Sequence, residues 1–306
     1  MRIISINNFL SQSAPLPIIM VRIYQTFDLV STNFIIYLFL YMALHIYQFR
    51  YAYSKICYDL ASEGFVVAAV EHREGSACHS TFRLPGLVTD IPHRVVRAGE
   101  NEYEVRHGQV VERAAEVSRV LDLLYALNAG GEAAFNALEN ALDTEAGFRL
   151  EDLLPPGSLD LSHGAYMMGH SFGGATALLA AARDARFRAV VSLDPWMFPL
   201  GRLEFRVTQP VLMINTEGFV HKNSIDKVRE ACADLSARIL AGAVHLVHTD
   251  APLLFTSELM KAGVGMACSK PAEVVLADNH AILHAWLRDR QENRTSKKAN
   301  EFGIKI

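Results

Sequence analysis

The residues in this chain best suited to chemistry surround Ser171, in the sequence G-H-S-F-G at 169–173. The apolar segment 165–168 precedes them and the alanine-rich segment 175–182 follows, so the order is strand, G-x-S-x-G, helix. In such a turn a strained backbone holds the serine hydroxyl clear of the sheet, and the following helix N-terminus favours negative charge. The pattern predicts Ser171 as a nucleophile in acyl transfer, with the Phe172 N–H as a donor to the oxyanion.

A serine nucleophile needs a histidine to take its proton and a carboxylate to hold that histidine in the correct tautomer. In hydrolases built on parallel sheets, these partners follow the serine in the order acid, then histidine. Two acids stand at the ends of predicted strands, Asp194 after 189–193 and Glu217 after 211–215. Both fit, because the carboxyl ends of parallel strands gather at one edge of a sheet, and spacing alone does not choose between them.

The base is predicted to be His245, which follows the short apolar segment 239–240 in a loop beyond the last predicted strand. His248 and His280 are rival candidates. His170 directly precedes the serine, and its side chain is expected to point away from the turn.

Composition excludes several classes of protein. The 306-residue chain has 29 Lys and Arg against 33 Asp and Glu, a net charge of −4, so no basic surface for nucleic acid is predicted. The glycines around Ser171 lack the G-x-G-x-x-G spacing of a nucleotide-binding turn. Four cysteines, none in a C-x-x-C pair, argue against a zinc or redox site. They predict buried thiols, which favours a reducing compartment.

Elsewhere the hydrophobic pattern alternates between helix and strand. The continuous apolar run at 65–70 is typical of a strand in a parallel sheet covered on both faces. The pattern also predicts helices over 53–63, 110–127 and 128–150, and a loop over 72–100. We therefore expect an α/β protein with a mostly parallel sheet and helices on both faces.

The first 48 residues differ in character from the rest. Phe34–Leu44 is an unbroken apolar run of eleven residues, shorter than the roughly 20 that a membrane span needs. It also begins late for a signal peptide. Three interpretations stay open: a tilted signal anchor, a buried helix, or a segment outside the functional fold. We divide the chain into an atypical apolar segment at 1–48, a main domain at 49–290 and a polar tail at 291–306.

Taken together, these residues resemble the platelet-activating factor acetylhydrolase family, which includes the lipoprotein-associated and intracellular type II phospholipases A2. The similarity covers about residues 49–288, in the segments YSKICYDLASEGFVVAAVEHRE, GHSFGGATALL, RFRAVVSLDPWMFPLG, PVLMINTEGF and GAVH. GHSFGG followed by LDxWMFPLG is a far more specific combination than G-x-S-x-G alone.

The resemblance implies the α/β-hydrolase fold, with Ser171 as nucleophile, Asp194 as acid and His245 as base, so that Glu217 becomes a neighbour of the triad. Phe172 supplies one oxyanion donor. An apolar lip for lipid chains is also implied, although ordinary core packing explains these side chains equally well. The residues of this lip are Trp196, Met197, Phe198 and Leu200.

The implied activity is that of a serine esterase of lipid catabolism, a 1-alkyl-2-acetylglycerophosphocholine esterase. It would remove sn-2 acetyl, short or oxidised acyl groups from platelet-activating-factor-like phospholipids without calcium. No metal or organic cofactor is expected. The expected partners are the phospholipid substrate and a membrane or lipoprotein surface, not nucleic acid. A cytoplasmic or membrane-associated location is favoured over a secreted one.

One segment departs from the family pattern. The family carries an H-G-x-G turn before the Phe-Arg that matches Phe49–Arg50, and its backbone supplies a second oxyanion donor. Here residues 44–48 read LHIYQ, without glycine, and the family's upstream strands are not recognisable in 1–43. We therefore expect the N-terminal strands to be missing or replaced. Because losing an oxyanion donor costs about 10²–10³ in rate, the main alternative is a catalytically impaired lipid-binding relic. The second alternative is a hydrolase that acts on other esters.

Overall fold

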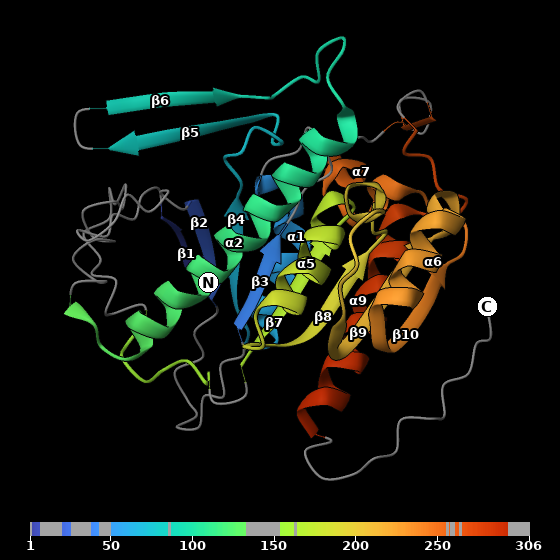
Figure 1. The fold of residues 1–306 in the computed structure, drawn as a ribbon. Helices are drawn as coiled ribbons and strands as arrows, with labels where there is room; N and C mark the ends of the chain where they lie inside the picture. Colours follow the sequence, from blue (N-terminus) through green and yellow to red (C-terminus); the bar gives the residue numbers. More distant parts are fainter. Residues whose placement is uncertain are drawn as a thin grey trace.

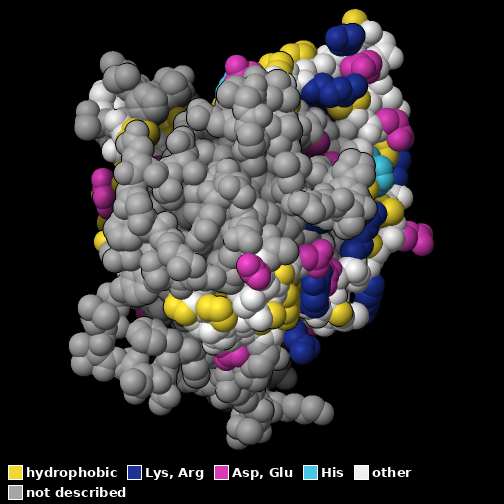
Figure 2. All heavy atoms as spheres, turned by 90° about the vertical axis from the view of Figure 1, so that its left-hand side faces the viewer, with side chains coloured by type: hydrophobic (Ala, Val, Ile, Leu, Met, Phe, Trp, Pro, Cys, Tyr) yellow, Lys and Arg dark blue, Asp and Glu magenta, His cyan; other side chains and the backbone are white. Residues whose placement is uncertain are grey.

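The computed structural model describes a sheet with helices packed on both of its faces (Figure 1). The described residues are 2–6, 20–25, 38–42, 50–84, 87–132, 154–161, 164–254, 257, 261–262 and 265–292. On the face seen in Figure 2, acidic and basic side chains are interspersed among the described residues, as the small net charge leads one to expect.

Eight strands form the main sheet, in the order β1-β2-β4-β3-β7-β8-β9-β10. The first two pairs, β1 with β2 and β2 with β4, are antiparallel, and every pair from β4 to β10 is parallel. Their bounds are β1 Arg2–Ile6, β2 Met20–Gln25, β3 Leu38–Met42, β4 Val66–Glu71, β7 Ala165–His170, β8 Phe187–Leu193, β9 Val207–Thr216 and β10 Cys232–Leu240.

Each face of the sheet has its own hydrophobic core. Strand β4 reveals the division, because Val66, Ala68 and Val70 point into one core and Val67 and Ala69 into the other. The first core is covered by α2 (Glu102–Asn128), α5 (Phe172–Arg183) and α6 (Lys222–Ala231), and the second by α1 (Ser54–Ser62) and α9 (Ala272–Glu292). A short helix, α7 (Ala251–Leu254), lies near α9. The expectation of a mostly parallel sheet with helices on both faces is confirmed.

The N-terminal strands are present, which corrects the expectation that they are missing. Strand β3 forms inside the apolar run Phe34–Leu44 and lies between β4 and β7, with Leu40 opposite Ala68 on one side and Met167 on the other. A central strand of a parallel sheet is apolar along its whole length, which explains the run without a membrane span or a buried helix. Among the described residues, no helix is long and apolar enough to cross a membrane.

The sheet therefore extends across the boundary drawn at residue 48. The division into 1–48, 49–290 and 291–306 stays a prediction, and residues 293–306 of the polar tail lie outside the described part of the chain.

The remaining element predictions are mostly confirmed. The helix expected at 53–63 is α1, the strand at 65–70 is β4, and the helix at 110–127 lies within the longer α2. The loop expected over 72–100 is wrong in part, since β5 (His79–Leu84) and β6 (Leu87–Pro92) pair antiparallel there. The sequence signal missed there is Pro-Gly at residues 85–86, a dipeptide typical of a turn between two strands. Most of the helix expected over 128–150 lies outside the described residues.

Helix α2 buries several polar side chains against the end of β4. The Nδ1 atom of His72 lies 2.5 Å from Oε2 of Glu116, and both residues are buried. Burial raises the pKa of Glu116 to about 7 and lowers the pKa of His72 well below its usual value. The pair is therefore a neutral imidazole accepting a hydrogen bond from a protonated carboxyl over much of the acidic range.

We predict that Glu116→Gln removes one component of the pH dependence of stability. The unfolded carboxyl titrates near 4.5 and the folded one near 7, so the contribution of Glu116 to the stability of the natural protein falls as pH rises through this window. Glutamine keeps the donor and never ionises. The free energy of unfolding is measured by urea titration at pH 5 and at pH 8. We expect the difference, variant minus natural protein, to be about 2 kcal/mol more favourable to the variant at pH 8 than at pH 5.

Glu112→Gln is the matched control, because Glu112 lies on the same helix but its side chain is 48% exposed. It measures the effect of removing a surface carboxyl group from the same helix. A difference for Glu116→Gln that is the same at pH 5 and pH 8 would mean that Glu116 titrates as an ordinary carboxyl.

Candidate active site

Ser171 occupies a strained turn between β7 and α5. Its backbone has φ 59° and ψ −116°, a conformation that a residue with a side chain adopts only when its surroundings enforce it. The Ser171 N–H donates to Leu193 O at 2.8 Å, and its carbonyl accepts from the N–H of Trp196 at 2.9 Å. A Cβ on Gly169 would run into the carbonyl of Gly173, so only glycine allows the strand and helix to approach this closely.

Asp194 follows β8 directly and is completely buried, again with positive φ, at 43°. Three hydrogen bonds compensate for the burial of its carboxylate. Oδ1 accepts from the N–H of Thr216 at 2.6 Å, and Oδ2 accepts from the Thr216 hydroxyl at 2.6 Å and from Nδ1 of His245 at 3.0 Å. Thr216 ends β9, so two neighbouring strands fix the orientation of this carboxylate.

His245 begins the 3₁₀ helix η4 (His245–His248), beyond β10. The ring of Phe219 stacks on its imidazole, with centroids 3.7 Å apart and planes 16° from parallel. Phe219 also lines the same pocket as Ser171, so the histidine ring lies beside this pocket.

The geometry chooses Asp194 over Glu217 as the partner of His245. The Glu217 side chain accepts a hydrogen bond from the N–H of Gly242 at 2.7 Å. It therefore supports the loop that leads to His245 rather than facing the imidazole.

Two of the other histidines lie close to Asp194. The His248 Nε2 atom is 3.6 Å from Asp194 Oδ2, and burial lowers the pKa of His248 to about 4, which keeps the ring neutral. The expectation that His170 points away from the turn is wrong, because its Nε2 lies 3.4 Å from Nδ1 of His245. His280 lies elsewhere, near Asp59 and Glu63 on α1.

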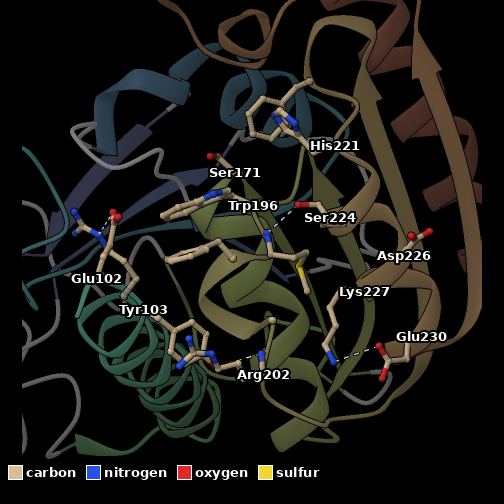
Figure 3. Close-up of a pocket in the computed structure, with 16 residues that line it drawn as sticks. Glu102, Tyr103, Ser171, Trp196, Arg202, His221, Ser224, Asp226, Lys227 and Glu230 are labelled. Carbon is tan, nitrogen blue, oxygen red and sulfur yellow. Dashed lines mark hydrogen bonds and ion pairs between the residues drawn. The ribbon is translucent and has the colours of Figure 1, made fainter.

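A pocket of about 900 Å³ opens beside Ser171 (Figure 3). It extends past Trp196 toward Tyr103 and Arg202, while Ser224 and Lys227 from α6 form another wall. The first wall combines aromatic with charged side chains, and the second is polar. Trp196, Met197 and Phe198 line the pocket, and their contact with lipid stays a prediction. Leu200 does not, because it is fully buried in the core under α2 and α5, and its expected lipid contact is corrected accordingly.

The sequence comparisons identify the family. Residues 40–301 match the family described as platelet-activating factor acetylhydrolase, isoform II. The chain belongs to this family.

Relatives of this chain include the platelet-activating factor acetylhydrolase of Gallus gallus, 35% identical over 253 residues, which are 77% of this chain and 58% of that protein. That of Bos taurus is 38% identical over 189 residues, 60% of this chain and 40% of that protein. A putative phospholipase A2 of Schizosaccharomyces pombe is 23% identical over 289 residues. The match covers 80% of this chain and 66% of that protein. This chain thus spans about half the length of the acetylhydrolases it matches.

Among solved structures, a ferulic acid esterase from Streptomyces cinnamoneus has a TM-score of 0.63 and 17% sequence identity. The superposition covers 98% of this chain and 92% of that one. This likeness confirms the α/β-hydrolase fold expected for the chain.

The acetylhydrolase segments GHSFGG and LDxWMFPLG contact each other through the hydrogen bonds of Ser171 described above. Phe172 begins α5, and its side chain is buried against the guanidinium of Arg113, whose Cζ lies 4.5 Å from the ring centre. That packing fixes the position of the Phe172 N–H at the helix N-terminus. The family's second oxyanion segment, at residues 44–48, lies outside the described residues.

Two groups of described side chains could hold a metal ion, as judged by donor atoms within 4.8 Å of one another. One is His170 with Asp194 and His245, and the other is His72 with Glu74 and Glu116. None of the four cysteines, all of which are described, forms a disulfide; Cys57 and Cys232 are buried, and the other two are partly exposed.

Sequence reasoning missed several residues of this site. Thr216, Phe219 and Tyr53 hold or contact the histidines and the acid, yet none belongs to a short motif with known chemistry. All three nevertheless lie in segments of the family similarity, Tyr53 at the start of YSKICYDL and the other two in TEGF.

We predict that Gly169→Ala severely destabilises the fold, because the new Cβ meets backbone atoms that cannot move without opening the turn. A loss of about 3 kcal/mol in the free energy of unfolding is expected from urea titration. Gly108→Ala is the control, since Gly108 lies within α2 and a Cβ there meets nothing within 4 Å. It should stabilise by up to about 1 kcal/mol. Equal stability of both variants would mean that the turn is not sterically constrained.

Proposed function

We propose that this chain is a calcium-independent serine esterase that hydrolyses the sn-2 acetyl, short or oxidised acyl ester of platelet-activating-factor-like phospholipids. The observation that carries the proposal is the hydrogen bond between His245 and the buried Asp194, beside a pocket that also contains the strained Ser171. Strain at a serine and a buried histidine–carboxylate pair both cost stability, and acyl transfer explains their presence together.

In this mechanism, the Ser171 hydroxyl attacks the ester carbonyl while Nε2 of His245 takes its proton. Asp194 keeps the other ring proton on Nδ1 and stabilises the imidazolium that forms. The Phe172 N–H donates to the oxyanion. Collapse of the tetrahedral intermediate expels the lysophospholipid, which receives the proton from His245. Water then hydrolyses the acyl-enzyme with His245 again as base, and releases the short acid.

The two walls of the pocket support a phospholipid as substrate. The rings of Trp196 and Phe198 stack with centroids 5.4 Å apart and offer an apolar surface for an acyl or alkyl chain. Arg202 and Lys227 also line the pocket; they are paired with Glu104 at 3.7 Å and Glu230 at 3.3 Å, and a substrate phosphate would have to replace one of these carboxylates. The relatives named platelet-activating factor acetylhydrolase and putative phospholipase A2 favour the same substrate class.

A lipid surface is proposed as the place where the enzyme meets its substrate. Phe198 is 42% exposed although it lines the pocket, so its ring can enter a membrane or lipoprotein surface at the entrance to the site.

We predict that Ser171→Ala lowers kcat at least about 10³-fold on a short-chain sn-2 ester of phosphatidylcholine, with EDTA present throughout. Asp194→Asn should lower kcat by a similar factor, because the amide no longer keeps the Nδ1 proton in place. Glu217→Gln is the control and should cost less than about tenfold, since it weakens one hydrogen bond to a loop.

Loss of activity in EDTA alone would overturn the metal-independent mechanism. No turnover by the folded natural protein would instead favour the lipid-binding relic, and turnover of simple esters but not of phospholipids would favour a hydrolase of other substrates.

We predict that Phe198→Ser reduces hydrolysis of substrate in phosphatidylcholine vesicles about tenfold relative to hydrolysis of a water-soluble ester, because an aromatic anchor is lost. Val95→Ser is the matched control, since Val95 is 66% exposed and does not line the pocket. The ratio of the two rates is the measurement. An unchanged ratio for Phe198→Ser would argue against contact between this residue and the lipid surface.

A further inference from the structure

Three potential metal ligands converge on the Nδ1 side of His245, opposite the Nε2 atom that takes the Ser171 proton in the proposed mechanism. They come from His245, His170 and Asp194, whose donor atoms all lie within 4.8 Å of one another. His245 Nδ1 lies 3.4 Å from His170 Nε2 and 3.0 Å from Asp194 Oδ2. We call this group the Nδ1 cluster.

Hydrogen bonding around the Nδ1 cluster leaves one proton at its centre. A carboxylate only accepts, so the Nδ1 proton of His245 points at Asp194. In the tautomer of His170 that suits a metal ligand, Nε2 directs its lone pair toward this N–H, 3.4 Å away, and the ring proton lies on Nδ1, directed at the Tyr53 oxygen 2.8 Å away. Two acceptors thus converge on a single N–H.

We propose that a zinc ion binds in the Nδ1 cluster and switches the esterase off. This inference rests on the proposed function, because the residues of the cluster include two members of the proposed triad. Zinc prefers imidazole nitrogen and carboxylate oxygen in tetrahedral geometry, with bonds of about 2.0–2.2 Å and hence donor atoms about 3.3 Å apart. The separations of 3.0 and 3.4 Å already approach this value.

The surroundings of the Nδ1 cluster match those of protein zinc sites. A metal-bound histidine usually donates its other ring N–H to a partner that fixes its orientation, as His170 does to Tyr53. Ligand carboxylates are likewise held by further hydrogen bonds, as Thr216 holds Asp194. Protein supplies two nitrogens and one oxygen, and water completes the coordination.

The inhibition follows from the position of one proton. When zinc bonds to Nδ1 of His245, the proton there is displaced and the neutral ring takes one up on Nε2, so none is gained or lost overall. Nε2 then has no lone pair to accept the Ser171 proton, and the nucleophile is not activated. The metal lies on the side of the ring away from substrate, so kcat should fall while KM changes little.

Ligand chemistry favours zinc over calcium or magnesium, which prefer sites built from oxygen. The other potential cluster, His72 with Glu74 and Glu116, is a poorer cation site. Arg113 already bonds to Glu74 at 2.8 Å, and the positive charges of Arg73 and Arg119 also act on Glu116.

The experiment measures zinc binding and zinc inhibition separately. Ser171→Ala protein, in which the Nδ1 cluster is intact, is titrated with Zn²⁺ against a chromogenic zinc indicator, and with Co²⁺ for the visible absorption of a tetrahedral site. The active protein is assayed on a water-soluble ester with Zn²⁺, Ca²⁺ or Mg²⁺. We expect one zinc per cluster, inhibition of kcat by Zn²⁺ alone, and full recovery on adding EDTA.

Two variants locate the metal, each compared with its own metal-free rate. His170→Gln removes a ligand, and Tyr53→Phe removes the group that orients it. Tyr53→Phe should raise the zinc concentration for half-inhibition about tenfold, and His170→Gln by more. His284→Gln is the control, because His284 lies on α9 and its Nε2 is 2.9 Å from the carboxylate of Glu63, outside the Nδ1 cluster. This variant should leave zinc inhibition unchanged.

Zinc inhibition that is unchanged in His170→Gln would overturn the proposal, as would the absence of zinc binding by Ser171→Ala protein. Because that titration needs no turnover, a failure of the zinc proposal can be told apart from a failure of the proposed esterase activity.

Discussion

The buried carboxylate of Asp194 is the constraint on which the whole site depends. A carboxylate with no exposed surface is tolerable only if its oxygens are held by donors, and here those donors come from the end of the next strand and from the loop beyond the last strand. Removing one donor would leave an uncompensated charge in the core. The same requirement fixes β8, β9 and the His245 loop relative to one another, which gives the imidazole a defined orientation beside the pocket.

The parallel sheet supplies the rest of the arrangement. Ser171 and Asp194 both follow directly from carboxyl ends of neighbouring strands, and both have backbone conformations that residues with side chains rarely adopt. Dense packing on both faces holds these conformations, because Gly169 lets α5 approach β7, and Gly174 lies where a Cβ would be 2.8 Å from the hydroxyl of Ser192. Two continuous cores therefore support the strain at the site.

Much of this could be predicted from sequence, and the failures have physical reasons. The G-x-S-x-G turn and the strand-end acids follow from local patterns, which predict Ser171 and His245 but leave Asp194 and Glu217 open; the choice of Asp194 came from the family resemblance. The strand within Phe34–Leu44 could not, because a short apolar run is equally compatible with a buried helix until its neighbours are known. The orientation of His170 depends on the strained turn beside it. The stacking of Phe219 depends on two loops distant in sequence.

The register of β8 against β9 has a consequence for how the chain becomes active. Leu193 lies opposite Ile214, and this pairing brings Thr216 to the carboxylate of the residue that follows Leu193. A slip of one residue would turn the Thr216 side chain to the other face of the sheet. The turn at Ser171 is a local structure, whereas its partners come from positions far along the chain and meet only when the parallel strands are in register. Covalent labelling of Ser171 by an ester-like reagent would therefore report the completion of folding, rather than the earlier formation of the turn itself.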